Sequence, residues 1–215
     1  MKVEIWSDVV CPWCYIGKRR FEKALELLRA EGISEPVEVV WRAFQLDPTA
    51  PVGNPTPAAD AYARKFGGPE VAARILEKVT DAAAQDGIEF RMDIALRANT
   101  VTAHRALHWA LETGGTEAQG VLKERLLKAY FTDGLDVGSV DVIARCATET
   151  GLDGEALLAW LLTDAGKEAV VADLQGAMDR EISAVPSFVI NDRFLVPGAQ
   201  EPDTFLLVLK RALTA

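Results

Sequence analysis

The sequence predicts an α/β fold in which two strand-bearing segments flank a long helical insertion. Near the amino terminus, residues 2–6 alternate apolar and polar side chains, a helical pattern follows, and the β-branched segment 36–41 comes next. Near the carboxyl terminus, two short apolar runs lie within residues 185–196. The alanine-rich stretch between these segments carries apolar residues at helical spacing. The predicted order is therefore β-α-β, a helical insertion and then α-β-β-α.

The first segment has the pattern of a β-α-β unit. The strand at 2–6 ends at the polar pair Ser7-Asp8. Apolar positions from Cys14 onward keep helical spacing until Gly32, which is typical of a residue just past a helix C-terminus. Because a crossover helix separates this strand from the one at 36–41, we expect the two strands to pair in parallel.

The insertion begins in a loop rich in proline over residues 47–57. Six helices are expected after it, near residues 57–66, 69–86, 100–113, 116–131, 139–150 and 153–163. Since none of them can bury its apolar stripe alone, we expect them to pack into one helical lobe. The sequence thus predicts an inserted helical domain over 47–165 and a second domain formed by 1–46 and 166–215.

The last segment returns the chain to the sheet. A helix is expected over about 166–180, and two short strands follow, separated by Asn191-Asp192, which is a hairpin-turn signal. Pro186 cannot donate a hydrogen bond within a sheet, so we expect it where a strand begins. A closing helix over 202–213 ends the pattern.

Composition and charge limit the classes of partner. The 215 residues include 32 acidic and 23 basic side chains, for a net charge of −9, so we expect no nucleic-acid or membrane partner. The longest apolar run, 156–162, has seven residues, whereas a membrane-spanning helix needs about 20. Acidic residues at positions 4 and 8 replace the apolar core of a secretory signal. We therefore expect a cytoplasmic protein, either a monomer or a homodimer.

The most informative motif is Cys11-Pro12-Trp13-Cys14. In a reducing compartment, a close cysteine pair is more often catalytic or metal-binding than structural. A helix N-terminus favours the thiolate and lowers a cysteine pKa, so Cys11 is predicted to be the nucleophile. Cys14, one turn further into the helix, suits the resolving thiol. Pro12 begins the helix without wasting a donor, and Trp13 should project outward as a contact surface for substrate.

A zinc-stabilised binding module is the non-enzymatic alternative. Cys11, Cys14, His104 and His108 would form a nominal Cys2His2 set. However, 89 residues separate the two halves of this set, against about 12–15 in compact zinc motifs. We therefore expect no metal and no other cofactor.

Five motifs, taken in chain order, resemble those of the FrnE-like branch of the DsbA family. They are Ser7-Asp8, then Cys11-Pro12-Trp13-Cys14-Tyr15-Ile16-Gly17-Lys18, then Asn99-Thr100 with Ala103-His104-Arg105, then Val185-Pro186-Ser187-Phe188-Val189-Ile190, and finally Gly198-Ala199-Gln200. The resemblance covers essentially the whole chain. It implies a thioredoxin-like fold with an inserted helical domain, and thiol-disulfide oxidoreductase activity on a disulfide-containing protein or a small-thiol substrate.

The resemblance also implies roles for four residues outside the cysteine motif. Pro186 matches the cis-proline loop that lies against the nucleophilic cysteine, and Val185 would present its backbone to substrate. His104 and Asn99 match a family motif and could line the groove opposite the cysteines. Equally, they could satisfy backbone groups at the start of the helix over 100–113. Cys146, which has no motif around it, is expected to fill the core as a small apolar residue.

The dipeptide between the two cysteines differs from that of DsbA, and this difference bears on the expected activity. DsbA itself has Pro-His between its cysteines, and that histidine helps to stabilise the thiolate. Trp13 in its place predicts a milder oxidant and argues against a role as a dedicated disulfide donor.

Kappa-type glutathione transferases and 2-hydroxychromene-2-carboxylate isomerases resemble this chain in fold, but typically have serine where Cys11 stands. A glutathione-activating hydroxyl needs no resolving thiol, so Cys14 argues against this rival.

Overall fold

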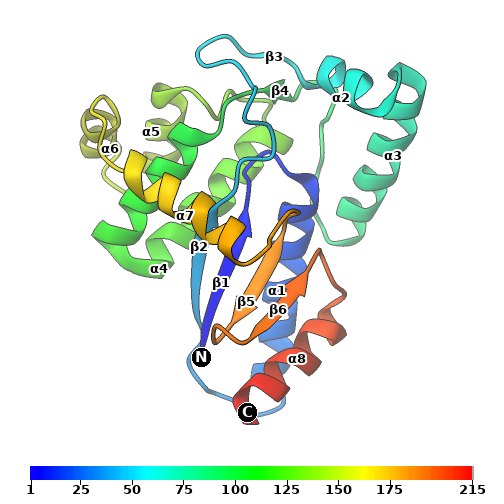
Figure 1. Ribbon diagram of the computed structural model, residues 1–215, viewed down its shortest axis with the longest axis vertical. Helices are drawn as coiled ribbons and strands as arrows, with labels where there is room; N and C mark the ends of the chain where they lie inside the picture. The colour runs from blue at the N-terminus through cyan, green and yellow to red at the C-terminus, as the bar shows by residue number, and fades with distance from the viewer. Residues whose placement is uncertain (215) are drawn as a thin grey trace.

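A four-stranded mixed sheet lies at the centre of the computed structural model, which describes residues 1–214 (Figure 1). Its strands are β1 (Lys2–Ser7), β2 (Glu38–Ala43), β5 (Ser187–Ile190) and β6 (Phe194–Pro197), in the order β2-β1-β5-β6. As predicted, β1 pairs in parallel with β2, and α1 (Pro12–Ala30) connects them. The hairpin of β5 and β6 is also confirmed, with positive φ angles of 50° and 54° at Asn191 and Asp192.

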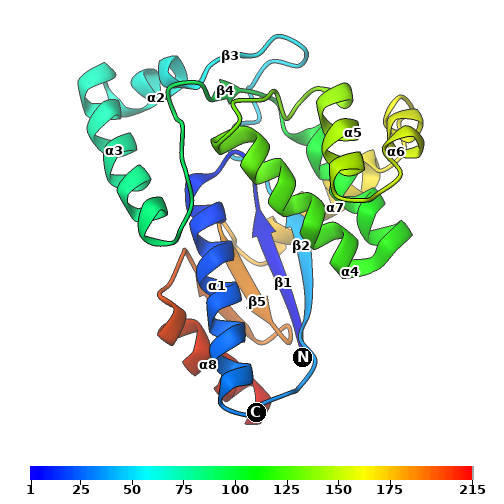
Figure 2. The same cartoon turned by 180° about the vertical axis from the view of Figure 1, so that it is seen from behind.

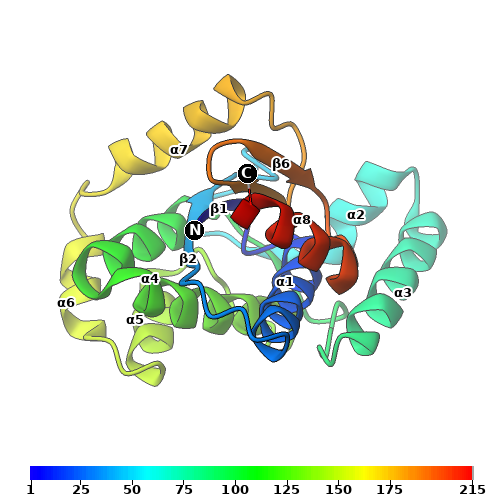
Figure 3. The same ribbon diagram turned by 90° about the horizontal axis from the view of Figure 1, so that it is seen from below.

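Helices cover both faces of the sheet. Seen from below in Figure 3, α7 (Lys167–Asp179) lies on one face, whereas α1 and α8 (Pro202–Thr214) lie on the other. Three aromatic side chains are fully buried between the sheet and the layer of α1 and α8, with ring centroids 4.6–5.4 Å apart. They are Phe21, Phe188 and Phe205. This aromatic cluster fixes α1 on the sheet because it removes large apolar side chains from water.

The remaining helices form a helical lobe that is continuous with the start of α1. They are α2 (Ala58–Phe66), α3 (Pro69–Gln85), α4 (Val101–Phe131), α5 (Val140–Glu149) and α6 (Gly154–Leu161). The apolar core of the lobe includes Tyr15 and Ile16 of α1. In Figure 2 both chain termini lie at the lower end of the sheet, whereas α2, α3, α5 and α6 lie toward its other end. The domain limits at residues 46 and 165 stay a prediction.

The lobe shows the break expected at Gly114-Gly115 and one ribbon that was not expected. The two helices expected on either side of this glycine pair are joined end to end in α4 at a kink, where Gly115 leaves the helical region with φ 71° and ψ −167°. A two-stranded ribbon of β3 (Thr56–Pro57) and β4 (Leu96–Arg97) was not expected, because two-residue strands carry no periodic pattern. None of the helices in residues 1–214 has the length and apolarity that crossing a bilayer requires.

Side chains of α4 and α7 form hydrogen bonds with backbone groups at the outer edge of β2. Gln119 of α4 accepts a hydrogen bond from the Trp41 amide at 2.8 Å and donates one to the Trp41 carbonyl at 2.9 Å. Asp173 of α7 accepts a hydrogen bond from the Ala43 amide at 2.9 Å. An edge strand otherwise exposes unpaired backbone groups, so these contacts join the helical lobe to the sheet.

Gly17 allows the loop before β5 to approach α1. A methyl group at this position would lie 2.8 Å from Cγ of Pro186 and 3.4 Å from Cα of Ala199. Both neighbours are stiff, since one is a proline ring and the other is backbone. The close approach of α1 to this loop therefore depends on the missing side chain.

We expect Gly17→Ala to lower the free energy of unfolding. Overpacking typically costs about 1–3 kcal/mol, which exceeds the roughly 1 kcal/mol that alanine gains over glycine within a helix. Urea denaturation measures the difference. Gly120→Ala in α4 is the matched control, because nothing lies within 4 Å of the added methyl group and the variant should be as stable as the wild type or more so. A Gly17→Ala protein as stable as the wild type would contradict the packing argument.

Candidate active site at the cysteine pair

The cysteine motif occupies the first turn of α1, as predicted. Cys11 is the N-cap residue, with φ −92° and ψ 115°, and Pro12 is the first helical residue. Cys11 is 3% exposed and Cys14 is fully buried, so only Cys11 has any surface open to another molecule. Trp13 lies next to it with 45% of its surface exposed. The geometry fits one cysteine that reaches the protein surface with a small part of its area, one fully enclosed cysteine and an aromatic contact surface.

The Val185-Pro186 loop meets the pair from the other side. The thiol of Cys11 donates a hydrogen bond to the Val185 carbonyl, with a sulfur-to-oxygen distance of 3.6 Å. The Val185-Pro186 peptide bond is cis, and Pro186 is buried against α1. The structure therefore brings together Cys11, Val185 and Pro186 from opposite ends of the chain.

A buried carboxylate, that of Asp8, lies close to the cysteine motif, since the Cys11 amide donates a hydrogen bond to the Asp8 carbonyl at 3.4 Å. Asp8 is fully buried and accepts hydrogen bonds from the amides of Val9 at 2.8 Å and Leu46 at 2.7 Å. His104 Nε2 lies 3.1 Å from Asp8 Oδ1 and 3.0 Å from the carbonyl oxygen of Phe44. Because both of these partners are acceptors, Nε2 carries the proton and donates. Burial opposes ionisation of Asp8, but the hydrogen bonds from His104 and the Leu46 amide hold its pKa below the ordinary value.

The other candidate site residues, Asn99, His104 and His108, do not line a groove opposite the cysteines. Asn99 donates to the Ala50 carbonyl and accepts from the Val101 amide, both at 3.1 Å, which fits the structural alternative. His104 is buried, so it contacts Asp8 rather than an open groove. Within residues 1–214, no three or more histidine, cysteine and acidic side chains are grouped so that they could hold a metal ion, so the set proposed with His108 is not assembled.

The electrostatics of the pair differ from the expectation that Cys11 has a lowered pKa. Hydrogen bonding with Cys14 and burial raise the pKa of Cys11, and the negative charge of Asp8 acts in the same direction. For Cys14, burial opposes ionisation, but the hydrogen bond with Cys11 and the positive charge of Lys123 bring its pKa below the ordinary value. At Cys11, neighbouring groups and burial thus outweigh the helix N-terminus.

Sequence reasoning missed two charged residues that face the sulfurs. Asp8 was noted only as part of a motif, although a carboxylate directly after a buried strand is a signal for a buried charge. Lys123 was not noted at all and is fully buried on α4. Its signal was a lysine within the apolar stripe that includes Leu126, Leu127 and Tyr130.

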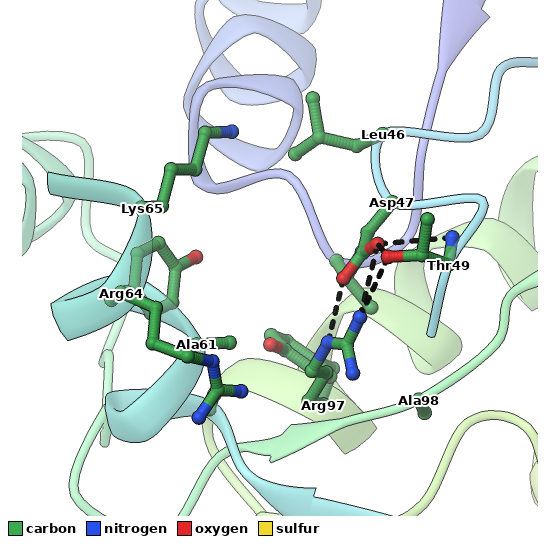
Figure 4. A pocket seen from close by; sticks show the side chains of 12 residues that line it. Leu46, Asp47, Thr49, Ala61, Arg64, Lys65, Arg97 and Ala98 are labelled. Carbon is green, nitrogen blue, oxygen red and sulfur yellow. Dashed lines mark hydrogen bonds and ion pairs between the residues drawn. The ribbon is translucent and has the colours of Figure 1, made fainter. Parts of the chain in front are cut away.

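A cavity of about 440 Å³ opens beside the cysteine motif (Figure 4). Val10, the residue before Cys11, lines it together with residues of α2, β4 and the loop after β2. Arg64 and Lys65 of α2 lie on one wall, and Arg97, which pairs with Asp47 at 2.7 Å, lies on the other. Burial raises the pKa of Tyr62, another lining residue, and the negative charge of Asp8 acts in the same direction.

We expect Asp8→Asn to destabilise the fold by about 1–3 kcal/mol, because the amide places a donor against the donors that the carboxylate accepts from. The folded pKa of Asp8 lies below its ordinary value of 3.8, so its contribution is fully present above about pH 3.8 and lost as the pH falls further. Urea denaturation between about pH 6 and 3 should show the stability gap to the wild type narrowing. The control is Asp60→Asn, at an exposed position of α2. A gap that stays constant down to the lowest pH would contradict this assignment.

Comparison with known proteins identifies the family. The family model described as a DSBA-like thioredoxin domain matches residues 2–210. The structure of a probable DsbA oxidoreductase from Streptomyces coelicolor is 34% identical, with a TM-score of 0.89 over 100% of this chain and 90% of that chain. Two structures at 17% identity share the fold. They are the cytosolic disulfide reductase DsbM from Pseudomonas aeruginosa with GSH (TM-score 0.69, 100% of both chains) and a 2-hydroxychromene-2-carboxylate isomerase (TM-score 0.65, 100% of this chain and 95% of that chain).

These matches extend over the sheet, the cysteine motif and the helical lobe alike. They confirm the thioredoxin-like α/β fold expected from the sequence. The chain belongs to the DSBA-like thioredoxin domain family.

Proposed function

We propose that this protein exchanges disulfides with dithiols through Cys11 and Cys14. The observation that carries the proposal is the contrast between the two cysteines: Cys11 keeps 3% of its surface exposed and lies beside the Val185 carbonyl, whereas Cys14 is fully buried one turn further into α1. Such a contrast suits a first thiol that attacks and a second thiol that resolves. Membership of a family that contains oxidoreductases supports the same assignment.

The pair can carry out both halves of the exchange. When the pair gives up one proton, the proton that remains can lie on Cys14, which leaves the negative charge on Cys11. Cys11 then attacks a substrate disulfide, forms a mixed disulfide and releases the first substrate thiolate. Cys14 loses its proton and attacks Cys11 Sγ, which releases the second substrate thiolate and forms the Cys11–Cys14 disulfide. The substrate gains the two electrons that the dithiol loses, and the same steps run in reverse for oxidation.

We propose that the cavity beside Val10 holds part of the substrate, with Trp13 and the Val185 backbone as further contacts. Arg64 and Lys65 give this wall positive charge in a chain of net charge −9, which favours a disulfide or thiol that carries carboxylates. The presence of GSH in the DsbM structure supports a small thiol as one substrate class. A reducing compartment such as the cytoplasm would keep the pair in its dithiol form, and the FrnE-like assignment within the family stays a prediction.

Cysteine variants test the exchange and the two roles. Cys11→Ser should abolish reduction of insulin disulfides, because no accessible nucleophile remains. Cys14→Ser should still be alkylated at Cys11 and should accumulate mixed disulfides, since the resolving thiol is missing. Cys146→Ser is the control, because Cys146 is buried within α5 in the helical lobe and should leave turnover unchanged. Faster labelling of Cys14 than of Cys11 by iodoacetamide would reverse the role assignment.

A glutathione-dependent isomerase of the hydroxychromene type is the second candidate. The fold shared with that isomerase and the positively charged cavity, which would accept an aromatic carboxylate, both favour it. Incubation with 2-hydroxychromene-2-carboxylate and glutathione separates the candidates, because isomerisation needs no resolving thiol and would persist in Cys14→Ser. Isomerisation by this variant, together with an absence of insulin reduction by the wild type, would replace the oxidoreductase proposal.

A further inference from the structure

Lys123 is a fully buried lysine whose Nζ atom makes no hydrogen bond with any residue among 1–214. A buried ammonium group without an ion-pair or hydrogen-bond partner is costly, because it loses its hydration. Lys18, the cation that acts on Lys123, does have partners, because its Nζ atom lies 2.6 Å from carboxylate oxygens of both Glu22 and Glu124. The burial of Lys123 without such a partner therefore needs a specific explanation.

The position of Lys123 is set by the contact between α4 and the sheet. Gln119, one turn earlier, holds the backbone of Trp41 at both its amide and its carbonyl. Lys123 Nζ consequently lies over the Trp41 ring, 5.4 Å from its centroid. α4 thus places one buried positive charge in the core, where its strongest charge interaction is with Cys14, and the contacts of Gln119 with the Trp41 backbone hold that part of α4 in place.

The groups that face Lys123 from the neighbouring elements are mostly acidic. Burial lowers the pKa of Lys123 to about 8, while negative charge at Cys14, Asp8 and Cys11, in decreasing order of effect, raises it and Lys18 lowers it. Below this value the side chain is mainly an ammonium ion. Asp8 has its own donors in His104 and two backbone amides. The fully buried Cys14 sulfur is stabilised in its charged form by hydrogen bonds with Cys11, Ser7 and the Asp8 backbone, and by the positive charge of Lys123.

We propose that Lys123 is a positioning residue of the thiol pair, whose buried ammonium group balances the negative charge that forms on Cys14 when this thiol resolves a mixed disulfide. The inference rests on the proposed exchange function. In the step concerned, Cys14 gives up its proton and its sulfur bonds to Cys11 Sγ. The bond between Cys11 and the substrate sulfur breaks, and the substrate leaves as a thiolate that takes up a proton. Lys123 exchanges no atoms or electrons and acts only through its charge.

The test is a titration of Cys14 in the full-length reduced protein with Cys11→Ser as background, followed by ultraviolet thiolate absorbance. An opposite charge nearby typically shifts a pKa by one or more units, so adding Lys123→Met should raise the Cys14 midpoint by about one pH unit or more. Lys128→Met in the same background is the matched control, because Lys128 is exposed on the same helix and its loss changes the net charge equally. It should leave the midpoint unchanged.

Thermal unfolding of the same variants separates the charge effect from a structural one. Replacing an unpaired buried charge by an apolar side chain of similar length should leave stability unchanged or raise it, while the Cys14 midpoint still moves. If Lys123→Met does not fold, Lys123→Gln is titrated in its place. An unchanged Cys14 midpoint in the folded variant would overturn the proposal. The titration needs no disulfide substrate, so its outcome is independent of whether the wild type reduces insulin.

Discussion

The buried carboxylate of Asp8 is the contact on which the arrangement of the site depends. A charge without water must be met by donors, and here they come from three segments: Val9 after β1, Leu46 after β2 and His104 of α4. Since His104 also donates to the Phe44 carbonyl, the same imidazole joins the segment after β1 to the segment after β2. The cysteine motif begins three residues after Asp8, so its place relative to the helical lobe is set by these hydrogen bonds.

The helical lobe therefore belongs to the chemistry of the site as well as to its shape. Its core includes Tyr15 and Ile16, which lie directly after Cys14 on α1, and α4 contributes both His104 and Lys123. Two opposite charges, Asp8 and Lys123, act on the thiols. The pKa of Cys11, which keeps 3% of its surface exposed, is raised, whereas the pKa of the fully buried Cys14 is lowered.

This division has a physical cause that a helix N-terminus alone does not supply. The helix dipole acts on both cysteines of the first turn and is worth typically below about 2 kcal/mol. Burial, a neighbouring thiol and a fixed ion act on each sulfur separately, because their effects depend on distance and on which atoms are desolvated. The order of acidity within the motif is consequently a property of the whole site.

Most of the fold follows from local patterns in the sequence. Period-two alternation, helical spacing, glycine and proline positions and the Asn191-Asp192 turn predicted the parallel β-α-β unit, the hairpin and the helices, because these features are decided within a few residues. The short ribbon of β3 and β4 was not predicted, because a strand of two residues shows no alternation of apolar and polar side chains. The cysteine motif and its place at the start of α1 were likewise evident from spacing alone.

The charges that act on the sulfurs come together only when the helices pack on the sheet. Asp8 and His104 are 96 residues apart in sequence, and Lys123 is as remote from Cys14, so no local pattern links them. Their effect comes from removal of water and from distances across the core, which exist only after α4 has packed on β2. Local patterns along the chain place two thiols at a helix N-terminus. Packing sets how deeply each thiol is buried and which charged groups act on it.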